Sequence, residues 1–123
     1  MKKIELMELS NFIEEIPSIK TIDFGYYKNN NWWIKIKIDI SNNIVWNVVQ
    51  ELGHILNYIS TNEKLPTIFY PVSPPPYMNG GPNDFLSWII ESKESSFSPI
   101  NALEWLKGRL PNPVDDLSLW NSN

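Results

Sequence analysis

The sequence feature that most constrains the fold is the strict alternation from Trp32 to Ile40, where isoleucine occupies every second position from 34 onward. The intervening positions hold Trp33, Lys35, Lys37 and Asp39. Successive side chains of a β-strand point to opposite faces, so this pattern indicates a strand with one buried face. Residues 21–27 also alternate, and the three asparagines at 29–31 tolerate the backbone of a tight turn. The stretch of about 20–40 is therefore predicted to be an antiparallel β-hairpin.

A helical period follows this hairpin. Apolar residues recur at spacings of three and four from Val45 to Ile59, which predicts a helix of about 44–60 with one buried stripe. We expect this helix to lie across the isoleucine face of the hairpin. A shorter helix is predicted over 9–16, with Asn11 as its cap and Pro17 as its end.

The second half of the chain is predicted to be mainly helical. Phe85, Trp88 and Ile89 have helical spacing, which predicts a helix of about 83–92. Ser98 followed by Pro99 is typical of a helix start and predicts a helix of about 98–108. Residues 65–72 could add an edge strand, and 115–120 could form one further turn. The prediction is one α+β domain spanning 1–123, with an antiparallel sheet packed against helices.

Composition narrows the class of protein. The 123 residues are 42% hydrophobic and 20% charged, which is typical of a soluble globular domain. The absence of cysteine excludes disulfides, thiolate catalysis and zinc fingers. A net charge of −4 and a single arginine disfavour nucleic acid as a partner. No export signal or membrane-spanning stretch is apparent, so we expect a cytoplasmic protein without a membrane partner.

Enzymatic chemistry finds little support in the residues. His54 is the sole histidine, and Glu51 lies one helical turn before it. This pair could serve a small hydrolase or transferase with the proline-rich loop as its lid, and that function stays open as an alternative. No nucleophile motif, phosphate-binding loop or metal-ligand spacing accompanies the pair. We expect a non-enzymatic protein with no cofactor and no metal.

The aromatic residues suggest binding instead. The chain holds six tryptophans, and we expect most of them to lie in the core or at its edge. Trp33 falls on the polar side of its strand, while Tyr77 and Trp120 fall in irregular, proline-flanked segments. Exposed Trp and Tyr are the side chains from which protein-binding hot spots are built. Residues 74–77, Pro-Pro-Pro-Tyr, also match a short WW-domain ligand, but we expect a rigid loop whose tyrosine folds back on the domain.

Three strings carry a resemblance to a known family: Phe69 to Pro82, Phe85 to Ile90, and Trp105 to Pro113, followed by Trp120. Together they resemble the bacterial immunity proteins of contact-dependent growth inhibition systems. The similarity extends from Trp32 to Trp120 and rests on Pro, Gly and Trp positions. It implies a small cytoplasmic protein that binds the C-terminal toxin domain, often a nuclease, delivered by a neighbouring cell. It implies that the bound toxin is blocked.

Charge, rather than the resemblance, suggests where a toxin would bind. A nuclease needs a basic cleft for phosphates, and a protein that occludes such a cleft should present carboxylates. The candidate partner-binding residues are two aromatic anchors and six acids: Trp33, Tyr77, Asp84, Glu91, Glu94, Glu104, Asp115 and Asp116. Each acid is also compatible with an ordinary solvated surface position. A third reading is an adaptor subunit of a bacterial assembly, and the toxin's identity and the oligomeric state stay open.

Overall fold

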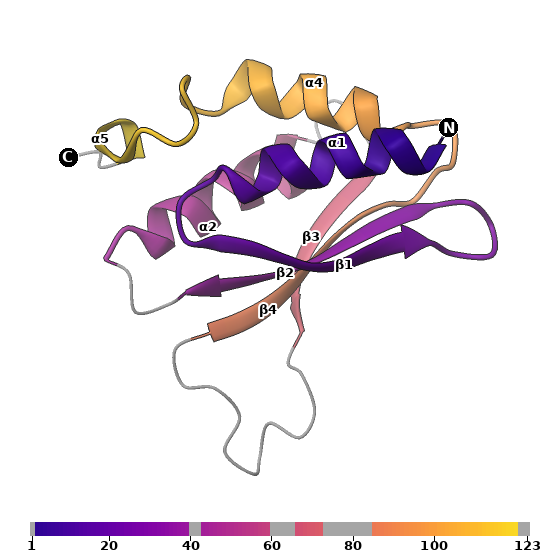
Figure 1. Ribbon diagram of the computed structural model, residues 1–123, viewed down its shortest axis with the longest axis horizontal. Coiled ribbons are helices and arrows are strands. Elements are labelled where there is room, and N and C mark those ends of the chain that lie inside the picture. The colour runs from indigo at the N-terminus through magenta and orange to yellow at the C-terminus, as the bar shows by residue number, and fades with distance from the viewer. Residues whose placement is uncertain (1, 40–42, 60–65, 73–84, 121–123) are drawn as a thin grey trace, which may run out of the picture.

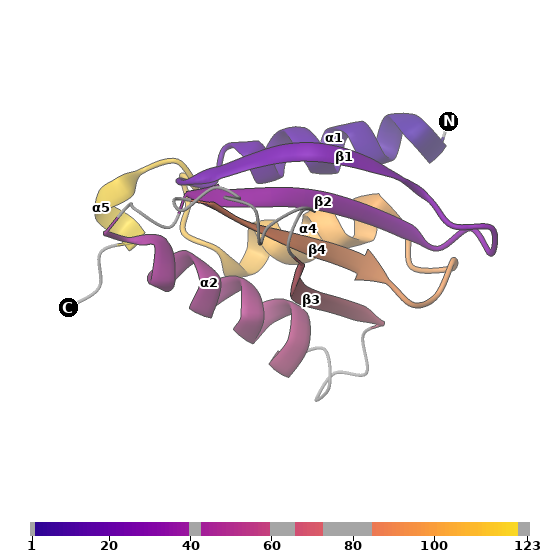
Figure 2. The same ribbon diagram turned by 90° about the horizontal axis from the view of Figure 1, so that it is seen from below.

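The computed structural model describes residues 2–39, 43–59, 66–72 and 85–120. Four antiparallel strands form one sheet in the order β1-β2-β4-β3. Helices α1, α2 and α4 lie on one face of this sheet (Figure 1), and the view from below shows the other face of the strands (Figure 2). The predicted α+β class is confirmed.

The hairpin forms as predicted. Strands β1 (Ile19–Tyr26) and β2 (Trp32–Asp39) pair antiparallel, with Ile19 opposite Ile38 and Tyr26 opposite Trp32. Their connecting turn is held by the Asn31 carbonyl, which accepts from the Tyr27 N–H at 2.8 Å, and it contains Asn30 at a φ of 71°. Burial alternates without exception along β2, so the isoleucine face is the inner face of the sheet.

The predicted helix over 83–92 is wrong, because this segment is strand β4 (Phe85–Ser92) at the centre of the sheet. Its buried hydrophobic residues, Trp88 and Ile90, are two positions apart and face the core. A short apolar run fits either period, and pairing with a strand on each side decides in favour of the extended form. The second half of the chain is therefore not mainly helical. It supplies half of the sheet.

The predicted edge strand is confirmed as β3 (Thr67–Val72), which pairs with β4 alone. Its free edge is closed by the chain itself, because Asn57 makes two hydrogen bonds to the main chain of Phe69. The Asn57 Nδ2 donates to the Phe69 carbonyl, and the Phe69 N–H donates to Asn57 Oδ1, both at 2.8 Å. The opposite edge, β1, has a bulge between Thr21 and Asp23, and the Thr21 N–H donates to a Glu14 carboxylate oxygen.

The helices differ in detail from the predictions. Helix α1 (Lys2–Glu14) is longer than 9–16, so Asn11 lies inside the helix and does not cap it. The 44–60 prediction is confirmed as α2 (Val45–Gly53), which continues as the π-helix η1 (His54–Ile59). Helix α4 (Pro99–Arg109) begins as expected, since Ser98 Oγ accepts from the Asn101 N–H at 3.1 Å. A final turn, α5 (Leu117–Trp120), ends the described chain.

The core lies between the inner face of the sheet and the helices. It contains the β2 isoleucines, the buried stripe of α2 and one side of α1, together with Leu106 of α4. Helix α1 packs over β1, whereas η1 packs over β3. This arrangement leaves two large surfaces for function: the outer face of the sheet and the outer side of the helices.

Candidate partner-binding surfaces

On the outer face of the sheet, two of the predicted residues lie side by side. Trp33 of β2 is directly opposite Glu91 of β4, so an aromatic ring and a carboxylate are neighbours on the two central strands of the sheet. Both side chains are half-buried. The predicted placement of Trp33 on the non-core face of its strand is thereby confirmed.

Two tyrosines converge on the Glu91 carboxylate. The Tyr27 hydroxyl donates to Glu91 Oε1 at 2.6 Å, and the Tyr70 hydroxyl donates to the same oxygen at 3.2 Å. Burial, reinforced by the neighbouring carboxylate, raises the pKa of both Tyr27 and Tyr70. The ring of Tyr27 is tilted against Trp33, with centroids 6.3 Å apart. We call Tyr27, Trp33, Tyr70 and Glu91 the tyrosine–glutamate cluster.

Gly25 makes room for the Trp33 ring. A side chain at Gly25 would begin 3.1 Å from Trp33 Cζ2, because the indole lies across the glycine backbone on the neighbouring strand. Glycine weakens a strand, and a cross-strand aromatic ring that covers it compensates for this loss. Trp33 is therefore held in place by the sheet, and its position is fixed before any partner arrives.

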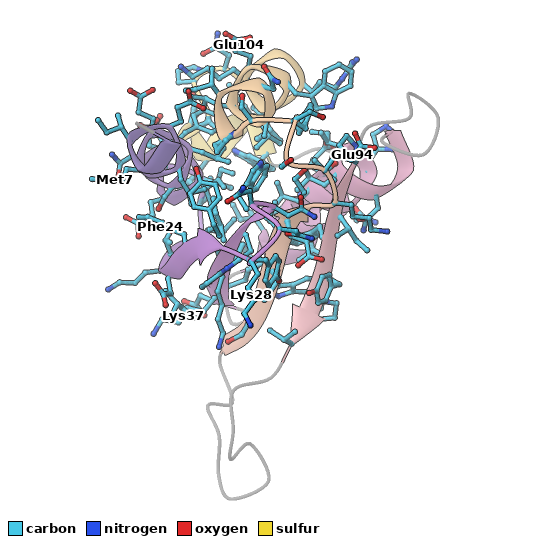
Figure 3. All side chains as sticks on the ribbon, turned by 90° about the vertical axis from the view of Figure 1, so that its right-hand side faces the viewer. Met7, Phe24, Lys28, Lys37, Glu94 and Glu104 are labelled. Carbon is cyan, nitrogen blue, oxygen red and sulfur yellow. The ribbon has the colours of Figure 1, made fainter. Side chains whose placement is uncertain are left out.

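The outer side of the helices has a different character, because it is acidic. Helices α1, α2 and α4 and the segment 110–120 contain seven acidic and four basic residues, whereas the strands and the β1–β2 turn contain three acidic and four basic ones. In Figure 3, Glu104 lies on the side of α4 that faces away from the sheet, and Lys28 and Lys37 lie at the sheet. Charge is therefore divided between the two layers of the fold.

An open groove of about 540 Å³ runs along this acidic side between α1 and the C-terminal part of the chain. Glu8 and Phe12 of α1, with Glu15 just after it, line one wall, and Leu103 and Lys107 of α4 line another. The acidity of this side comes from both halves of the chain. Sequence reasoning considered only the acids of the second half and thus missed Glu8 and Glu15, which line the same groove.

The predicted set of partner-binding residues is divided by the fold. Glu104, Asp115 and Asp116 lie on the helix side, away from the tyrosine–glutamate cluster that contains Trp33 and Glu91. Glu94 is exposed in the turn after β4, where its N–H donates to Ser92 Oγ. The two remaining predictions, Tyr77 and Asp84, lie outside the described residues, as do residues 74–77.

Trp120 is not an exposed anchor, because its side chain is only 3% exposed. The indole Nε1 donates to the Val114 carbonyl at 2.7 Å, which fixes the last turn of the chain against the core. Trp32 and Trp88 are also buried, in agreement with the expectation that most tryptophans belong to the core. The most exposed tryptophan among the described residues is Trp46, which sequence reasoning counted among the core candidates.

The alternative catalytic pair stays a prediction. Glu51 and His54 are both exposed on the helix that begins at Val45, and Glu51 lines a groove of about 470 Å³ that His54 does not line. Within the described residues, no three acidic or histidine side chains converge as a metal site would require. The proline-rich segment suggested as a lid lies outside the described residues.

Comparisons with known proteins give no relative for this chain: no family model, no curated protein and no solved structure matches it. In the part of the chain that the structure describes, no helix combines the length and the apolar character needed to cross a membrane.

Proposed function

We propose that this chain is a non-enzymatic immunity protein that binds a cognate toxin domain in the cytoplasm and blocks its activity. The observation that carries the proposal is the division of charge between the layers, which concentrates carboxylates on the outer side of the helices. A toxin that cleaves RNA or DNA has a basic cleft for phosphates, and an acidic surface complements such a cleft.

Electrostatics of this kind has a kinetic benefit for an immunity protein. Opposite potentials steer two proteins together and raise the association rate well above that of a neutral pair. A toxin that enters a cell must be captured before it acts, so rapid association is the property that selection would favour. Glu8 lies on α1 and Glu104 on α4, which packs against α1, and Glu15 directly follows α1. All three are exposed, so an approaching basic surface would meet them first.

The same surface is shaped for contact. Phe12 and Leu103 line its open groove, and the carboxylate-bearing Glu8 and Glu15 line the same groove. Protein interfaces combine an apolar centre with a polar rim, and this groove has both parts. The tyrosine–glutamate cluster on the opposite face is less suited to pair with a basic cleft, because its carboxylate already accepts hydrogen bonds from two hydroxyls.

The experiment that tests this function starts from the native host. The tagged chain is purified, the protein that co-elutes is identified, and that protein is expressed alone and together with the chain. The proposal predicts a partner that stops growth alone and is harmless when the chain is present. A partner that co-elutes stably but is not toxic when expressed alone would refute the immunity function. It would instead support the function of an adaptor subunit.

A further inference from the structure

Helix α5 lies next to the start of α2 at one end of the molecule (Figures 1 and 2). These two elements carry three large, exposed apolar side chains. Trp46 of α2 is 57% exposed, and Leu117 and Leu119 of α5 are 56% and 46% exposed. We call these three residues the Trp46 patch. Apolar side chains that gather on a surface mark interaction sites, and tryptophan is the residue most enriched in binding hot spots.

The chain holds the two parts of the Trp46 patch together. Asn47, which follows Trp46, donates from Nδ2 to the Trp120 carbonyl at 2.6 Å, and this bond ties α2 to α5. The buried Trp120 ring is itself anchored through its bond to the Val114 carbonyl. The patch is therefore organised before binding, so little conformational entropy is lost when a partner contacts it.

A groove of about 470 Å³ adjoins the patch and widens the contact area. It is lined by Asn47, Gln50 and Glu51 of α2 on one side and by Leu119 of α5 on the other. Gln50 lies one helical turn after Trp46, so the tryptophan has a residue of the groove as its neighbour on the surface of α2. The groove supplies amide and carboxylate groups next to an exposed apolar anchor.

Three carboxylates lie on or next to the elements that carry the Trp46 patch. Asp115 and Asp116 directly precede α5, and Glu51 lines the groove; all three are exposed. The one arginine that lines the groove, Arg109, has its guanidinium 4.2 Å from the centroid of the Trp105 ring. An apolar centre with an acidic rim complements a segment that presents apolar side chains flanked by Lys or Arg.

We infer that the Trp46 patch is the anchor of a protein interface whose partner element is a basic, amphipathic segment. This inference rests on the proposed function and refines it, because it names the part of the acidic side that makes the central contact. The occupant is a segment of the partner protein and not a second copy of this chain, since another acidic rim would repel the first.

A synthetic amphipathic peptide of leucine and lysine, labelled for fluorescence anisotropy, tests the inference directly. The intact chain should bind this peptide, and binding should weaken as salt is raised. Trp46→Ala and Leu119→Ala should each weaken binding about 10-fold or more, as expected for hot-spot residues. Met7→Ala is the matched control, because Met7 is also 46% exposed but lies on α1, and it should leave the affinity unchanged.

Two results would overturn the inference. One is that the chain binds a peptide with every lysine replaced by glutamate as tightly as it binds the leucine–lysine peptide. The other is that Trp46→Ala and Leu119→Ala leave the affinity for the leucine–lysine peptide unchanged. The peptide contains no toxin, so its result is independent of the capture experiment. If the Trp46→Ala chain binds a captured toxin as tightly as the parent chain does, the Trp46 patch is not the anchor of the interface. The proposed immunity function is unaffected by that result.

Discussion

At the scale of single residues, the Glu91 carboxylate organises the outer face of the sheet. From its place on β4 it connects the β1–β2 turn with β3, because Tyr27 and Tyr70 both donate to Oε1. Hydrogen bonds to a charged acceptor are stronger than neutral ones, so this cluster stiffens a surface that has no helix upon it among the described elements.

The raised pKa values of Tyr27 and Tyr70 predict a specific pH dependence. Below pH 10.0, the ordinary tyrosine pKa, both phenols are protonated in the folded and unfolded chains, and their contribution is complete. Above it the unfolded chain loses these protons first, so the free energy of unfolding falls as the pH rises toward the folded pKa. Denaturant titrations from pH 8 to 11.5 should show this fall, and Tyr27→Phe should make it shallower. Identical slopes for the two chains would contradict the cluster.

The same substitution at the two tryptophans of the α2–α5 junction should have different effects on the free energy of unfolding. Trp120→Phe removes the bond to Val114 and leaves a buried carbonyl without its donor, which costs about 1–3 kcal/mol of unfolding free energy. Trp46→Phe changes an exposed ring and should stay within about 0.5 kcal/mol of the parent chain. Urea unfolding measures both values, and an equal loss in the two variants would show that the assigned burial is incorrect.

At the scale of elements, the closure of both sheet edges decides how this protein can meet a partner. Asn57 occupies the main-chain groups of Phe69 on β3, and the bulge with Glu14 interrupts the edge of β1. An exposed strand edge invites pairing with another chain, and these contacts prevent it. Partners are therefore expected to use side-chain surfaces and not strand addition.

Asn57→Ala tests this closure. The substitution exposes the N–H and carbonyl of Phe69, which should cost about 1–3 kcal/mol of unfolding free energy and promote association through β3. Urea unfolding and light scattering at increasing concentration measure the two effects. Asn101→Ala, an exposed site on α4, should show neither. A variant that unfolds as the parent chain does and scatters light as the parent chain does at every concentration would show that Asn57 does not protect the edge.

The elements also show which parts of the fold could be predicted from the sequence. The β1–β2 hairpin, α2 and α4 were predictable because local signals agree there: strict alternation, a helical stripe, and the Ser98–Pro99 start. Strand β4 was not, since its apolar residues fit both periods and only pairing with β2 and β3 selects the strand. The candidate binding surface was not predictable for a similar reason. Sequence spacing did not indicate that Trp33 and Asp115 belong to opposite layers.

At the scale of the whole molecule, the layered charge makes the protein an electrostatic dipole with its acidic end on the helices. Residues distant in sequence, such as Glu8 and Glu104, act on an approaching partner together because α1 and α4 pack against each other. This collective property was not visible in the net charge of −4 alone.

Association with the captured partner should therefore depend on salt and on the helix-side acids. Neutralising Glu8, Glu15 and Glu104 to glutamine should slow association about 10-fold at low ionic strength, with a smaller effect on dissociation. Stopped-flow mixing at several salt concentrations measures the rates. The paired control, Lys28→Gln with Lys35→Gln on the sheet side, should not slow association. Equal slowing by the two sets would mean that the acidic layer has no special role.

Neutralisation by binding differs from neutralisation by catalysis in its stoichiometry, and this difference tests the central claim most directly. Increasing amounts of the purified chain are added to a fixed amount of the captured partner, and the partner's remaining activity is measured. We predict a linear fall that reaches zero near one equivalent, with the same line for His54→Ala. Complete inactivation by a small fraction of an equivalent, lost in the His54→Ala chain, would contradict the account and establish an enzyme.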